Sequence, residues 1–142
     1  MNPNPLIRGM LALLLSPAPT WALAEQAPNC AQISAIDKYP GSESALVGAT
    51  CSAFLSQARA TGVSCFWAFP YRNQLALQNA DQIWEDLVQC RDGASLEPDT
   101  PVNHPDSYYL REWATDKAVY RVSVKDKAGQ SRTLVFLSMV EN

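Results

Sequence analysis

The segment Cys65–Phe69 (CFWAF) is apolar or aromatic at every position, so it lacks the alternation of a strand with one solvated face. The pattern predicts a strand over Val63–Phe69, which Pro70 ends. A second strand with apolar residues on both faces is predicted over Arg132–Val140. Both strands need cover on both faces, and we expect helices on opposite faces of the sheet to provide it. If the helices share one face, the other face keeps an apolar patch, which would indicate a partner or ligand site.

The remaining pattern predicts two helices and two further strands. Apolar residues at spacings of three and four predict helices over Ser42–Ala60 and Asn73–Arg91. Tyr108–Ala114 and Ala118–Lys125 are predicted strands, and the second of them alternates cleanly between apolar and polar positions. Three prolines make Ser95–Ser107 a loop. The predicted fold is α+β, with about four mostly antiparallel strands packed with two helices in a single small domain.

The first 24 residues read as a secretory signal peptide. Arg8 precedes a short apolar run, and Ala22-Leu23-Ala24 fits the rule of small residues at a cleavage site. The run is too short and too rich in proline to span a bilayer, although an uncleaved membrane anchor is the alternative. Cleavage would leave a single α+β domain over residues 25–142, without a membrane span.

The net charge argues against one class of partner. The chain carries 11 Lys and Arg and 14 Asp and Glu, and the signal segment contains one Arg and no acid, so the mature domain has a net charge of −4. Nucleic-acid binding rewards a concentrated basic patch, which this balance does not favour. We therefore expect no nucleic-acid partner.

Four cysteines lie after the signal segment, at positions 30, 51, 65 and 90. An even number in a small exported domain indicates two disulfides in an oxidising compartment. A strand from Cys65 followed by a helix back to Cys90 would bring these two ends together, so we predict Cys65–Cys90 and, by elimination, Cys30–Cys51. A zinc site is the alternative, but the cysteines lack the close spacing of structural zinc ligands.

The candidate catalytic residues lie in the proline-rich loop. His104 is the only histidine and lies two residues before Asp106, so the pair could act as a general base and the group that orients it. We interpret the segment instead as a turn whose polar side chains bond to the backbone. Glu97, Asp99 and Asp106 lack the ligand spacing of a calcium loop. We assign no catalytic residue, metal or cofactor.

These observations favour a non-catalytic, periplasmic or secreted binding or accessory protein that contacts another envelope protein through the sheet face or the loop. A small hydrolase-like enzyme using His104 and Asp106 is one alternative. A carrier of a small apolar ligand, lined by Trp67, Trp84 and Trp113, is another. The candidate binding residues are aromatic or charged and lie on the predicted strands and the loop: Trp67, Phe69, Tyr71, His104, Asp106, Tyr108, Arg121 and Lys125.

Overall fold

The computed structural model describes residues 27–97 and 107–142. The predicted signal segment 1–24, together with His104 and Asp106, lies outside these residues. In chain order the described elements are α1 (Cys30–Asp37), the 3-10 turn η1 (Glu43–Ala45), β1 (Thr50–Leu55), β2 (Thr61–Pro70), α2 (Gln74–Cys90), β3 (Ala94–Leu96), β4 (Ser107–Ala114), β5 (Ala118–Lys127), the 3-10 turn η2 (Ala128–Gln130) and β6 (Arg132–Glu141).

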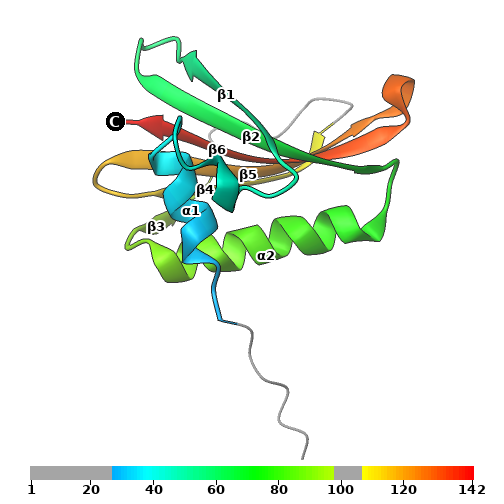
Figure 1. Cartoon of the computed structure of the whole chain (residues 1–142), viewed down its shortest axis with the longest axis horizontal. Coiled ribbons are helices and arrows are strands. Elements are labelled where there is room, and N and C mark those ends of the chain that lie inside the picture. Colours follow the sequence, from blue (N-terminus) through cyan, green and yellow to red (C-terminus); the bar gives the residue numbers. More distant parts are fainter. Residues whose placement is uncertain (1–26, 98–106) are drawn as a thin grey trace, which may run out of the picture.

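The strands form one antiparallel sheet in the order β1-β2-β6-β5-β4-β3 (Figure 1). The α+β class and the two disulfides are confirmed, but the sheet has six strands rather than about four. The four strands predicted from hydrophobic patterns are β2, β4, β5 and β6. The two additional strands, β1 and β3, are the edges of the sheet.

The predicted helix over Ser42–Ala60 is wrong. Only Glu43–Ala45 forms a 3-10 turn, and Thr50–Leu55 forms edge strand β1. A short apolar run fits both the helical and the strand period, so the spacing alone does not choose between them. Pairing with β2 decides the outcome, because Thr50 lies opposite Phe66 and Leu55 lies opposite Thr61.

The predicted helix over Asn73–Arg91 is confirmed as α2. Its first turn is capped by Asn73, whose side-chain oxygen accepts a hydrogen bond from the backbone N–H of Leu75 at 2.8 Å. The stripe that the helix buries against the sheet consists of Ala76, Ala80, Ile83 and Leu87. Helix α1 was not predicted; Asn29 caps it by accepting from the backbone N–H of Gln32 at 3.2 Å.

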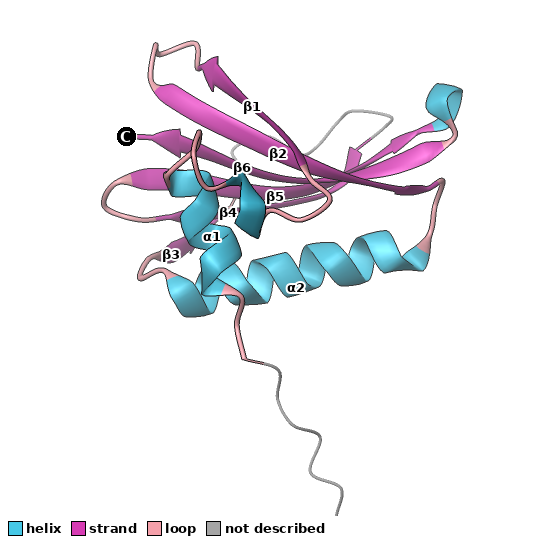
Figure 2. Ribbon diagram, in the orientation of Figure 1, coloured by secondary structure: helices cyan, strands magenta, loops and turns pink. Residues whose placement is uncertain are grey.

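Both α-helices pack on one face of the sheet (Figure 2). Our expectation of helices on opposite faces is therefore wrong. Alternate residues of the central strands form the core beneath the helices, including Cys65, Val122, Val135 and Leu137, each 0 % exposed. Side chains alternate between the two faces along a strand. The intervening residues of β2, β5 and β6 therefore point to the opposite face, which no helix covers within residues 27–97 and 107–142.

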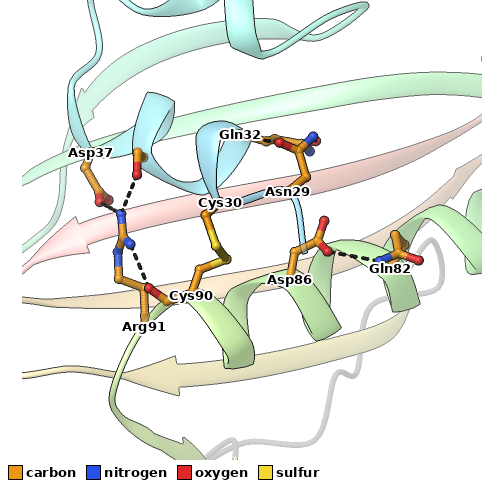
Figure 3. Close-up of a disulfide and its surroundings, with 9 residues drawn as sticks. Asn29, Cys30, Gln32, Asp37, Gln82, Asp86, Cys90 and Arg91 are labelled. Carbon is orange, nitrogen blue, oxygen red and sulfur yellow. Dashed lines mark hydrogen bonds and ion pairs between the residues drawn. A yellow bond between two sulfur atoms is a disulfide. The ribbon is translucent and has the colours of Figure 1, made fainter. Parts of the chain in front are cut away.

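The predicted disulfide pairing is also wrong. Cys30 pairs with Cys90, and Cys51 pairs with Cys65 (Figure 3 shows the first bridge). The strand register explains the second bridge, because Cys51 lies directly opposite Cys65 in the β1–β2 pair. The other bridge, between Cys30 and Cys90, links the first turn of α1 to the last turn of α2. The wrong pairing follows from the assumption that the helix after the strand brings Cys90 back to Cys65, whereas Cys90 is bonded to Cys30 of α1.

Candidate binding surface on the helix-free sheet face

The helix-free face is the side of the sheet opposite α1 and α2. A row of small hydroxyl side chains crosses it, because the strand register places Ser52 opposite Ser64 and Ser64 opposite Ser138. The Oγ atoms of Ser64 and Ser138 lie 2.9 Å apart and form a hydrogen bond. On the next strand Arg121 lies opposite Ser138. We call Ser52, Ser64 and Ser138 the serine row.

Aromatic side chains lie on both sides of the serine row. On one side the Phe54 ring covers Gly62, where an added Cβ would come within 2.5 Å of the ring. On the other side Phe66 and Phe136 contact each other with ring centroids 5.6 Å apart. Gly62 and Phe66 are four residues apart on one strand, so the backbone positions beneath the two aromatic groups are roughly 13 Å apart. The serines between them are too short to fill this space.

A cavity of about 300 Å³ occupies part of this space. That volume is at the lower end of the range for sites that bind small molecules or single side chains. The strands β1, β2, β4, β5 and β6 all contribute to it, and its lining combines aromatic, hydroxyl and cationic groups: Phe54, Ser64, Tyr109, Leu110, Arg121, Ser123, Lys125, Phe136 and Ser138.

Two cations line the cavity. The Nε of Arg121 donates to Glu112 at 2.9 Å, yet the Arg121 side chain remains 50 % exposed. The Nζ of Lys125 lies 5.3 Å from the centroid of the Phe136 ring, within the range of a cation–π contact. Phe136 is paired with Ser123, which lies between the two cations in the sequence of β5. Both cations therefore line the same cavity from one face of β5.

The structure brings together only two of the predicted binding residues, Arg121 and Lys125. Trp67 and Phe69 lie on the helix side and pack against the core. The Trp67 Nε1 donates to the carbonyl of Val47 at 2.9 Å. Tyr71 follows β2 and is 39 % exposed, with the Arg72 guanidinium over its ring.

Two other predicted residues, His104 and Asp106, fall outside the described part of the chain, as does the side chain of Tyr108. The grouping of His104 with Asp106 as a catalytic pair therefore stays a prediction.

Several residues of the surface were missed by the sequence reasoning. Ser64 and Ser138 are single polar residues inside otherwise apolar strand segments, VSCF and LSMV. A polar residue interrupting a continuous apolar strand is the signal that could have identified them. Phe54 was missed because its segment was assigned to a helix.

The three tryptophans suggested for an apolar carrier do not surround one space. Trp84 and Trp113 contact each other edge to face, with ring centroids 5.8 Å apart. Trp67 lies on β2, three strand positions away from β4, which carries Trp113. That separation is roughly 14 Å. The tryptophan arrangement therefore gives no support to a carrier function.

A larger cavity of about 800 Å³ lies at the end of α2, where α1 and β5 meet. Its central charges are satisfied within the fold. The Asp37 carboxylate accepts from the hydroxyl of Tyr120 at 2.6 Å and from the guanidinium of Arg91 at 2.5 Å (Figure 3 shows the Arg91 contact). This network connects α1, β5 and the end of α2, so its role is structural.

The same network gives a pH-dependent prediction. Burial and the hydrogen bond to Asp37 raise the pKa of Tyr120 to about 12, and burial raises that of Tyr109 to about 12. The unfolded chain releases these protons near pH 10. Between pH 10 and pH 12 the folded state therefore binds more protons than the unfolded state. The stabilisation is therefore complete below pH 10 and is lost as the pH rises toward 12.

Ultraviolet titration of tyrosinate tests this expectation. Tyr109 and Tyr120 should ionise late, and Tyr120→Phe should remove one of these late transitions. A titration in which Tyr120→Phe removes no late transition from the folded protein would contradict the assignment.

Among the described residues, no group of three or more His, Cys, Asp or Glu side chains is placed to hold a metal ion. The helices described here are all too short or too polar to cross a membrane.

Comparison with protein-family models, curated proteins and solved structures found no match to this chain.

Proposed function

We propose that this chain is an exported, non-catalytic binding or accessory protein, and that it contacts an envelope protein through the helix-free face. The observation that carries the proposal is the cavity on that face, where aromatic rings and two cations meet. Aromatic residues and arginine are enriched among the residues that dominate protein–protein binding energies. Two disulfides are typical of proteins outside the cytosol, which supports export.

The sheet is well suited to present such a surface. Its helix side is filled by the core, and the bridge between Cys51 and Cys65 holds edge strand β1 to β2. Phe54 on β1 is therefore fixed relative to Phe66 and Phe136 on the inner strands. A rigid surface loses little conformational entropy on binding, which favours affinity.

Quantitative capture from an envelope extract tests the proposal. The bait is the oxidised domain, residues 25–142, as wild type and as Phe136→Ser. The matched control is Leu75→Ser, which removes a 57 % exposed apolar side chain from α2. We expect Phe136→Ser to reduce the amount of captured partner at least tenfold, and Leu75→Ser to leave it unchanged.

Circular dichroism of each variant checks that the fold is retained. Capture that survives Phe136→Ser but is lost with Leu75→Ser would place the binding surface on the helices. The absence of any stoichiometric partner at low salt would also contradict the proposal.

A further inference from the structure

We propose that the cavity on the helix-free face receives a carboxylate side chain of an extended acidic segment of the partner protein, next to an aromatic or aliphatic side chain. This inference rests on the proposed function and adds the chemistry of the partner. It is carried by the meeting of Arg121 and Lys125 at the end of the serine row, between two groups of phenylalanines.

The charges of the cavity are not balanced within the described residues. Glu112 is bound by the Nε of Arg121, and its side chain is only 15 % exposed, so it neutralises one of the two cations. Lys125 lies over the Phe136 ring and forms no ion pair with a carboxylate among the described residues. One additional carboxylate above Ser123 would lie between the two cations and could accept from both. Charge-assisted bonds of this kind are among the stronger hydrogen bonds.

The strands around the cavity supply further positive charge and apolar contacts for a partner. On β5 and β6 the cations of this face include Arg121, Lys125 and Arg132, and Glu112 lies beside Arg121 on the neighbouring strand β4. This face is therefore locally basic in a chain that is acidic overall, with a net charge of −3. Charge complementarity thus favours an acidic partner over a basic one. Phe54, Leu110 and Phe136 supply apolar contacts beside the cations.

The shape of the surface favours an extended segment. The serine row crosses three strands, and Arg121 continues it on the fourth. The distance from β1 to β5 is roughly 14 Å, about the length of four extended residues. The serine row between the aromatic groups carries only short side chains, which leaves the cavity of about 300 Å³ for a side chain of the bound segment. The serine hydroxyls can donate to or accept from its backbone.

A displayed library of random heptapeptides, selected on the oxidised domain, tests the inference. We expect enrichment of peptides with Asp or Glu beside Phe, Tyr or Leu. Lys125→Glu should weaken the binding of a selected peptide at least tenfold. The matched control is Lys38→Glu, which makes the same charge change at an exposed position after α1 and should leave the affinity within twofold.

Three other outcomes would each overturn the inference, and each can be told apart from a failure of the proposed function. Enriched peptides without acids, bound in a manner sensitive to Phe136→Ser but not to Lys125→Glu, would refute the carboxylate and leave the proposed function standing. Failure to enrich any peptide would refute the extended segment, while the capture experiment would still report on the proposed function. If N-acetylphenylalanine binds as tightly as the selected peptide, the site takes a small carboxylic acid and not a protein segment.

Discussion

Replacing Cys30 and Cys90 with alanine is expected to lower the free energy of unfolding of the oxidised domain by about 4 kcal/mol. The bridge joins residues 60 positions apart, so its loss returns a long closed loop to the unfolded chain. It also removes the covalent link between α1 and the last turn of α2, and leaves the contacts of Arg91 with Asp37 and Ser34. Urea unfolding followed by circular dichroism measures the change.

The second bridge provides the matched control. Cys51 and Cys65 are 14 positions apart, and replacing both with alanine should cost about 3 kcal/mol, less than the first pair. An equal or larger loss from the Cys51 and Cys65 variant would contradict the ranking. Peptide mapping of the oxidised protein should recover the linked pairs 30–90 and 51–65; the pairs 30–51 and 65–90 would refute the described bridges.

Leu137→Ala is expected to destabilise the domain by about 3 kcal/mol, within the usual range for a buried leucine. Leu137 is 0 % exposed on β6, between Cys65 of β2 and Val122 of β5, on the helix side of the sheet. Truncation leaves a space that the rigid sheet cannot close, so the lost contacts are not replaced.

Leu75→Ala in the first turn of α2 is the matched control, because this leucine is 57 % exposed. It should change the free energy of unfolding by less than about 0.5 kcal/mol. Equal effects from the two substitutions would mean that β6 is not at the centre of the core.

Hydrophobic patterns predicted the inner part of the fold well. Continuous apolar strands such as Val63–Phe69 and the stripe of α2 carry strong signals, because burial constrains every position. The edge strands of the sheet were harder to predict. β1 was assigned to a helix, since its exposed positions carry no constraint and the spacing of Cys51, Phe54 and Leu55 fits a helical turn. The disulfide pairing failed with it, because pairing depends on strand register.

The candidate site was only partly predictable. Arg121 and Lys125 are two polar positions of an alternating strand, so their shared face followed from the period of two. Trp67 and Phe69 were named as candidate binding residues but lie on the helix side, because a fully apolar strand does not reveal which of its faces meets the helices. The serine row depends on the relative register of three strands, which no local pattern contains.

Site-specific photo-crosslinking tests the central claim, that the helix-free face contacts a partner, most directly. A benzophenone side chain is placed at Ala68, an exposed position on that face of β2, and separately at Glu85, an exposed position on α2. Irradiation in an envelope extract should give a defined protein adduct from position 68 and none from position 85. An adduct from position 85 alone, or from neither position, would contradict the account.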